Sequence, residues 1–315
     1  MKKMRPLRSF FTAALAAAMM LILPGLTAFG GNAEENEPVY MENEWNFVEG
    51  SMDISGGIPE NAIGVLGDIR EAGKLRVITE PYFAPQEFLD PEKEGQAQYA
   101  GADMELARLI ALRMGVELEI IPMEFTEVLG AVAARKGDLA ISALSYTPGR
   151  AASYELSKGY YFAESDVSSG VLIRKEDAEN IRSIEDLKNR TLMAQRGSLQ
   201  ESMAAEAIRT YLEFRRVSTI SEVYDGLKDG SADAAVVDLE SAQSYLGSEG
   251  GADLMFVEGI AFRLEEAYKG DRIAGKKGEL ELMYFVNGVI DEVNQKGLYT
   301  QWMEEARKRA AELGL

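Results

Sequence analysis

The chain has 315 residues, of which 46% are hydrophobic, and it carries 33 Lys and Arg against 52 Asp and Glu, a formal net charge of −19. This hydrophobic fraction supports ordinary packed cores, and the length allows one large domain or two modest ones. The acidic balance excludes nucleic acid as an expected partner, because binding to phosphates depends on Lys and Arg. The absence of Cys and His excludes disulfides, thiol catalysis, Cys/His metal sites and a histidine general base, so we expect no metal and no cofactor.

The first 30 residues predict a secretory signal peptide. Four basic residues precede an apolar stretch that ends at Pro24, and small residues follow, which is the layout of an export signal. The apolar stretch is short for a membrane span. We expect an exported protein, periplasmic or extracellular, and not a lipoprotein, because no Cys is present. The exported protein is then either free or held by an uncleaved segment.

Residues 31–61 are expected to form an acidic, exposed leader. The stretch from Glu34 to Glu60 contains no basic residue, and such composition favours a solvated segment. We expect it to pack only locally, through Trp45 and Phe47, and to be dispensable for ligand binding.

Strands and helices alternate along the rest of the chain, and the alternation begins twice. The first run consists of strands predicted at 74–79, 116–121 and 138–142 and of helices at 103–114 and 127–136, the second helix capped by Thr126. The second run consists of strands predicted at 191–195, 213–218 and 233–238 and of helices that begin near Ser198 and Ser221. This alternation predicts an α/β protein with mainly parallel sheets covered on both faces.

Residues 126–142 and 221–238 repeat one pattern: a hydroxyl residue followed by Glu and Val, a helix, and then Asp and an apolar strand. The hydroxyl residue and the Asp are 12 residues apart in both copies. We therefore predict two similar lobes, the second inserted in the first and joined to it by two hinge crossings. The first lobe is expected to contain residues 62–168 and 272–315, and the second residues 169–271.

Hydroxyl residues and an arginine follow the strand predicted at 138–142. Ser142, Ser145, Thr147 and Arg150 come at its carboxyl end, which is where ligands bind in open parallel sheets. Thr147 is followed by Pro, a pair typical of an N-cap and the first residue of a helix. The free N–H groups of such a helix start, together with the Arg150 guanidinium, could hold a carboxylate.

Asp238 ends the last strand of the second lobe, so it would face Arg150 if the lobes face one another. A cation and an anion on opposite walls of a cleft suit a zwitterion. Each residue also has a simpler interpretation: Arg150 as a solvated surface charge, and Asp238 as the cap of the next helix. The same holds for Ser198, which forms a capping box with Glu201.

Six stretches of sequence carry a resemblance that runs from about Gly73 to the C-terminus. They are KLRVITEPYFAPQEF, GADMELARLIALRMGVELEI, FTEVLGAVAARKGDLAISALSYTPGR, TLMAQRGSLQES, DAAVVD and FVNGVIDEVNQKGLYTQW. They resemble the extracellular solute-binding proteins of the polar amino-acid uptake family, the binding partners of bacterial ABC importers. The resemblance implies a two-lobed, periplasmic-binding-protein-like fold that captures an amino acid in the interlobe cleft and delivers it to the membrane subunits of an ABC permease. We expect the protein to be a monomer.

The resemblance also implies roles for individual residues. Arg150, with Ser145 and Thr147 beside it, would clamp the ligand α-carboxylate, and Asp238 would take the α-ammonium. The other expected ligand contacts are Phe83 and Phe125, which would pack on the ligand side chain, the hydroxyl groups of Ser142 and Ser198, and Glu80, which hints at a cationic or polar side chain. Two residues depart from the family pattern: Gln86 replaces an apolar residue, and Ala143 stands where some relatives have Ser.

Two other functions fit parts of this pattern. Related folds include exported dehydratases of cyclic amino-acid precursors, which would need a carboxylate acting as an acid above the ring. Carboxylates available for this role are Glu80, Glu87, Glu124 and Glu164. A receptor sensor domain is disfavoured, because no membrane or kinase segment follows Leu315. We expect a binding protein without enzymatic activity, with the dehydratase as the alternative.

Overall fold

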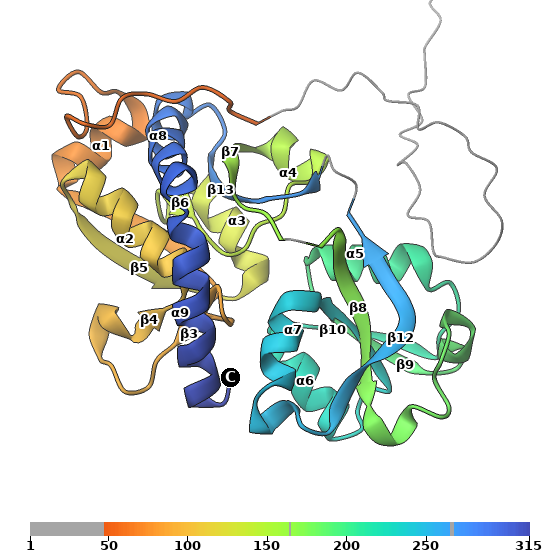
Figure 1. The fold of residues 1–315 in the computed structure, drawn as a ribbon. Coiled ribbons are helices and arrows are strands. Elements are labelled where there is room, and N and C mark those ends of the chain that lie inside the picture. Colours follow the sequence, from red (N-terminus) through yellow and green to blue (C-terminus); the bar gives the residue numbers. More distant parts are fainter. Residues whose placement is uncertain (1–46, 164, 265–267) are drawn as a thin grey trace, which may run out of the picture.

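The computed structural model describes residues 47–163, 165–264 and 268–315. The expected signal peptide, Trp45 and Glu164 lie outside the described residues. Figure 1 shows two bodies, each built around one sheet. Within the three described ranges, no helix has the length and apolar character needed to cross a bilayer.

The first lobe contains a five-stranded sheet in the order β5-β1-β6-β13-β7. Its strands are β1 (Lys74–Thr79), β5 (Glu117–Pro122), β6 (Leu139–Ala140), β7 (Tyr154–Tyr161) and β13 (Asp271–Lys276). A smaller sheet beside it consists of β2 (Tyr82–Phe83), β3 (Glu87–Leu89) and β4 (Tyr99–Ala100). The helices of this lobe are α1 (Gly64–Ala72), α2 (Ala102–Met114), α3 (Phe125–Ala133), α4 (Pro148–Ser153), α8 (Leu280–Lys296) and α9 (Leu298–Leu313), with a 3-10 turn at Gly95–Gln98.

The second lobe repeats this plan with a sheet in the order β10-β9-β11-β8-β12. Its strands are β8 (Val167–Arg174), β9 (Thr191–Gln195), β10 (Glu213–Val217), β11 (Ala234–Asp238) and β12 (Leu254–Arg263). Its helices are α5 (Leu199–Ala207), α6 (Ile220–Lys228) and α7 (Leu239–Leu246), with 3-10 turns at Lys175–Asp177, Ile184–Leu187 and Glu249–Gly251. The chain crosses between the lobes twice, between β7 and β8 and between β12 and β13.

One strand in each sheet runs against the other four. β13 is antiparallel to both of its neighbours in the first sheet, and β8 is antiparallel to both of its neighbours in the second. The remaining pairs are parallel. The expectation of two mainly parallel sheets is confirmed, and the two reversed strands are those that enter a sheet directly after a crossing.

The strands of both sheets are buried on two faces. In β1, Leu75 and Val77 belong to one hydrophobic cluster and Ile78 to another. In β11, Val236 and Val237 likewise belong to different clusters. Because neighbouring side chains of a strand point to opposite faces, each sheet has a packed layer on both sides.

Two helices begin earlier than the sequence pattern predicts. The N-cap of α3 is Glu124 rather than Thr126, and the helix that was expected to begin near Ser221 is capped by Thr219. In both copies of the repeat the N-cap lies two residues before the hydroxyl residue, Thr126 or Ser221, so the two copies remain aligned. At Thr219 the capping hydrogen bond comes from the backbone N–H of Glu222.

Residues 47–58, in the expected leader, do not pack only locally: half of them are exposed, but the segment lies against the first lobe. Val48 is buried, and its backbone N–H donates to the carbonyl of Leu156 at 2.9 Å. The amide of Asn287, in α8, donates to the carbonyls of Val48 and Gly50 at 2.6 and 2.8 Å. This segment therefore contributes to the packing of α8.

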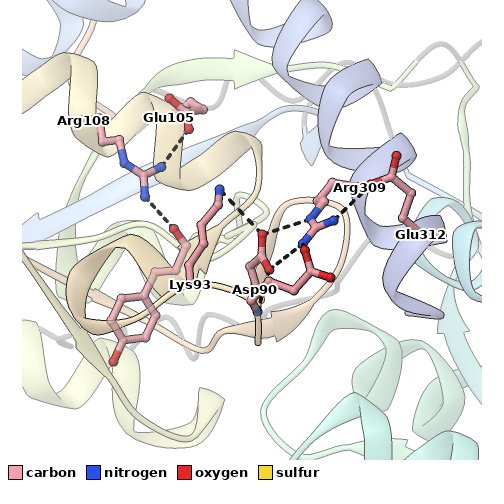
Figure 2. Close-up of polar contacts among 8 residues, drawn as sticks. Asp90, Lys93, Glu105, Arg108, Arg309 and Glu312 are labelled. Atoms are coloured by element: carbon pink, nitrogen blue, oxygen red, sulfur yellow. Dashed lines mark hydrogen bonds and ion pairs between the residues drawn. The ribbon is translucent and has the colours of Figure 1, made fainter.

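An ion-pair network ties the last helix to the loop after β3, as Figure 2 shows. Arg309 of α9 donates to both carboxylate oxygens of Asp90, at 2.9 and 2.8 Å, and Lys93 lies 3.6 Å from the same carboxylate. The Asp90 side chain is fully buried, and its hydrogen bonds with Arg309 lower its pKa to about 2. The contact fixes the β2–β3 hairpin, which carries Phe83 and Glu87.

Candidate functional site

A cavity of about 600 Å³ lies between the two lobes, a volume within the usual range of small-molecule sites. Eight of the nine expected ligand-binding residues line it: Glu80, Phe83, Phe125, Ser142, Ser145, Arg150, Ser198 and Asp238. Thr147 is outside the lining. Its hydroxyl accepts a hydrogen bond from the Arg150 backbone N–H at 3.1 Å, so it caps α4 and positions the arginine.

Arg150 lies in the first turn of α4 and reaches into the cleft. One of its terminal nitrogens donates to the carbonyl of Ser145 at 2.7 Å, and the other to the carbonyl of Gly197, in the second lobe, at 3.4 Å. Its guanidinium carbon lies 5.9 Å from the ring centre of Phe125. Burial lowers the pKa of Arg150 to about 10, so the side chain remains a cation at neutral pH and can hold a carboxylate.

Asp238 both caps a helix and lines the cleft. Its Oδ1 accepts the backbone N–H of Ser241 at 2.9 Å, which caps α7. Burial raises the pKa of Asp238 to about 6. Ser198 has the same double position, because its hydroxyl accepts the Glu201 backbone N–H at 3.0 Å while the residue lines the cavity. Capping and ligand contact are therefore compatible at both residues.

Two buried carboxyl groups line the cavity close to each other. The Ser142 hydroxyl accepts the backbone N–H of Glu80 at 3.1 Å and donates to the Glu87 carboxyl group at 2.8 Å. The amide of Gln195 in the second lobe donates to Glu80 Oε1 at 3.2 Å. Burial raises the pKa of Glu80 to about 8 and that of Glu87 well above its usual value.

Three buried oxygens in the cavity lining have no hydrogen-bond donor among the described residues. They are Glu80 Oε2, Gln86 Oε1 and Glu87 Oε2. The three residues are 1%, 3% and 1% exposed. A buried acceptor without a donor is costly, so this part of the cavity suits a ligand group that supplies several N–H donors.

Contacts between the lobes cross the cavity. The Tyr161 hydroxyl, at the end of β7, donates to both carboxylate oxygens of Glu240 in α7, each at 2.7 Å. Arg307 of α9 forms an ion pair with the same carboxylate. Together with the hydrogen bond between Gln195 and Glu80, these contacts hold the two lobes against each other around the cavity.

Sequence reasoning missed several residues of the lining. Gln195 ends β9, and the rule that ligands bind at the carboxyl ends of parallel strands could have found it. Asp271 could not be found in this way, because it begins β13. Since β13 is antiparallel to β6, its first residue lies at the edge where the parallel strands end.

Comparison with known proteins agrees with this geometry. The family model for bacterial extracellular solute-binding proteins, family 3, matches residues 75–306. The arginine-binding extracellular protein ArtP of Bacillus subtilis (strain 168) is 30% identical over 230 residues, which cover 72% of this chain and 84% of that protein. The lysine/arginine/ornithine-binding periplasmic protein of Escherichia coli (strain K12) is 26% identical over 229 residues, 71% of this chain and 84% of that protein.

Solved structures show the same fold. An amino acid ABC transporter substrate-binding protein, AbpA of Streptococcus pneumoniae, bound to L-arginine, superposes with a TM-score of 0.69 at 30% identity, over 78% of this chain and 98% of that one. The ancestral amino-acid-binding protein AncCDT-1, a precursor of cyclohexadienyl dehydratase, superposes with a TM-score of 0.65 at 27% identity, over 77% and 99%. That relative is itself described as a binding protein, so the dehydratase alternative is the weaker one. The chain belongs to the bacterial extracellular solute-binding proteins of family 3 and has a solute-binding role.

Proposed function

We propose that this protein captures an amino acid with a cationic side chain, Arg150 holding its α-carboxylate and Asp238 its α-ammonium. After export directed by residues 1–30, it would deliver the ligand as a monomer to the membrane subunits of an ABC importer. The two lobes, the first with strand β13 in its sheet and the second with strand β8 in its sheet, would close around the ligand by a hinge motion. The family and the relatives that are named for arginine support this assignment.

The observation that carries the choice of a cationic side chain is the set of unpaired oxygens of Glu80, Gln86 and Glu87. A guanidinium brings five N–H donors and an ammonium brings three. An apolar side chain would leave these oxygens unpaired, and an acidic one would place a further negative charge beside two buried carboxyl groups without adding an N–H donor. Phe83 and Phe125, which line the same cavity, would cover the aliphatic part of the side chain and stack on the cation.

The test is calorimetry on protein that has been unfolded, freed of ligand and refolded, against L-arginine, L-lysine, L-histidine, L-leucine and L-glutamate. We expect binding of the cationic amino acids and none of L-leucine or L-glutamate. Arg150→Ala should weaken binding by about thirty-fold to several thousand-fold, because it leaves the ligand carboxylate buried and unpaired. Preferential binding of L-leucine or L-glutamate by wild type would contradict the proposal.

A further inference from the structure

A third charged residue lies beside the proposed clamp for the amino acid. Asp271, the first residue of β13, lines the cavity together with Arg150 and Asp238. It pairs with Tyr161 at the end of β7 and forms an isolated antiparallel bridge with Ser145. Because the carbonyl of Ser145 also accepts the hydrogen bond from Arg150, the backbone holds Asp271 next to the residue that anchors the arginine.

Asp271 is partly exposed and lines the cavity, and within the described ranges its carboxylate forms no hydrogen bond and no ion pair with another side chain. The neighbouring cation Arg272 is engaged elsewhere: it donates to the carbonyl of Ser157 at 2.9 Å and stacks on Phe47, 4.0 Å from the ring centre. The neighbouring anion Asp103 is also occupied, because it accepts the Tyr299 hydroxyl at 2.6 Å. Asp271 thus presents an unused carboxylate to the cleft.

The electrostatic surroundings of this carboxylate favour a cationic partner. Burial, followed by the negative charges of Asp103 and Asp238, raises the pKa of Asp271 well above its usual value, whereas Arg150 and Arg272 lower it only in part. An ammonium group placed between Asp238 and Asp271 would let both carboxylates ionise and would fill its three donors.

We propose that Asp271 is a second ligand-binding carboxylate, which shares the α-ammonium of the amino acid with Asp238. This inference rests on the proposed function, because it concerns the same ligand in the same cleft. This second carboxylate makes the site selective for ligands with a free α-ammonium. A ligand that lacks this group would leave two carboxylates facing each other without a cation, in addition to losing its own hydrogen bonds.

The alternative role of Asp271 is that of a counter-ion to Arg150. In that case removal of its charge would change the hold of Arg150 on the ligand carboxylate, and the effect would be equal for ligands with and without the α-ammonium. A thermodynamic cycle therefore separates the two roles: the affinities of two ligands, with and without the α-ammonium, are compared in proteins with and without the Asp271 charge.

The experiment measures calorimetric affinities of L-arginine and of 5-guanidinopentanoate, which is the same molecule without the α-ammonium. The proteins are wild type, Asp271→Asn and the control Asp166→Asn. Asp166 lines the same cavity, but its carboxylate is paired with Arg263 at 2.6 Å. We expect the preference of wild type for L-arginine over 5-guanidinopentanoate to shrink by about tenfold in Asp271→Asn and to be unchanged in Asp166→Asn.

Two outcomes decide the matter. An unchanged preference in Asp271→Asn overturns the role of Asp271 and leaves the proposed function standing. Failure of wild type to bind any amino acid overturns the proposed function, and this inference with it. Because Asp271→Asn is expected to bind 5-guanidinopentanoate at least as well as wild type does, that binding also reports that the variant is folded.

Discussion

Raising the pH from 6 to 8 is expected to strengthen the binding of a cationic amino acid, because Glu80 must lose a proton to pair with it. The Glu80 side chain is buried, accepts one hydrogen bond from Gln195 at 3.2 Å, and has a second oxygen without a donor. Burial raises its pKa to about 8, so in the empty cleft at neutral pH the carboxyl group is mostly neutral. The other charged groups lining this cleft include Glu87, whose pKa is also raised, and the cation Arg150.

The size of the effect follows from that pKa. A cationic ligand stabilises the carboxylate and lowers the pKa of Glu80 in the complex, so binding releases a proton and the affinity increases with pH. With a pKa of about 8 in the free protein, about one molecule in eleven has an ionised Glu80 at pH 7 and about one in a hundred at pH 6. Ionisation of Glu80 by itself should therefore place the affinity about tenfold below its high-pH limit at pH 7 and about a hundredfold below it at pH 6. Asp238, with a pKa of about 6, adds only about a further twofold at pH 6.

The assay is titration calorimetry with L-arginine at pH 6, 7 and 8, in phosphate and in Tris, whose ionisation enthalpies differ. The difference between buffers should show that wild type releases about 0.9 proton more than Glu80→Gln at pH 7. Glu80→Gln should remove the part of the pH dependence that comes from Glu80 and bind less tightly at pH 8, whereas Glu124→Gln, outside the cavity lining, should behave as wild type. An affinity that does not change between pH 6 and 8, or uptake of a proton by wild type, would refute the reasoning.

Four further outcomes are expected. Because the folded protein raises the pKa of Glu80 above its ordinary value, the Tm of ligand-free protein in scanning fluorimetry should fall as pH rises from 5 to 8, and the drop should be smaller with saturating ligand. A chain beginning at residue 61 loses Val48 and its hydrogen bonds, so it should unfold about 3 kcal/mol more easily than one beginning at residue 47 in urea melts, while its folded form keeps its affinity. Arg309→Gln leaves the buried Asp90 with the longer ion pair to Lys93 in place of the Arg309 hydrogen bonds and should lower both the Tm and, through the β2–β3 hairpin, the affinity measured by calorimetry. Small-angle scattering should show a smaller radius with ligand than without, and an unchanged radius despite tight binding would contradict hinge closure.

The sequence pattern was most informative where hydrophobic periodicity determines the structure. Strands β1 and β9 begin and end at the predicted residues. Runs of buried apolar residues with clear ends can be predicted without knowledge of the tertiary structure. The antiparallel direction of β8 and β13 could not be predicted from the sequence. Periodicity records burial and carries no information about which way a strand runs in its sheet, and the reversal of these strands follows from the two crossings.

Residues at helix starts were harder to interpret, because a cap and a ligand contact use the same residue types. Thr147 was expected in the cleft, but its hydroxyl caps α4 and it lies outside the cavity lining. Asp238 and Ser198 were ambiguous for the same reason, and in the structure both cap a helix and line the cavity. Composition alone cannot separate these cases, since the N–H groups that a cap satisfies and those that a ligand would use belong to the same helix turn.

The placement of the clamp residues also determines the order in which ligand contacts form. Arg150 and Asp271, the first residue of β13, belong to the first lobe, whereas Asp238 belongs to the second lobe. A hinge motion keeps contacts within the first lobe, and it separates contacts made across the cleft. We therefore expect the open form to bind the α-carboxylate and α-ammonium through Arg150 and Asp271 first. Closure then adds Asp238 to an ammonium that is already in place, so that without this cation the approach of the two carboxylates opposes closing.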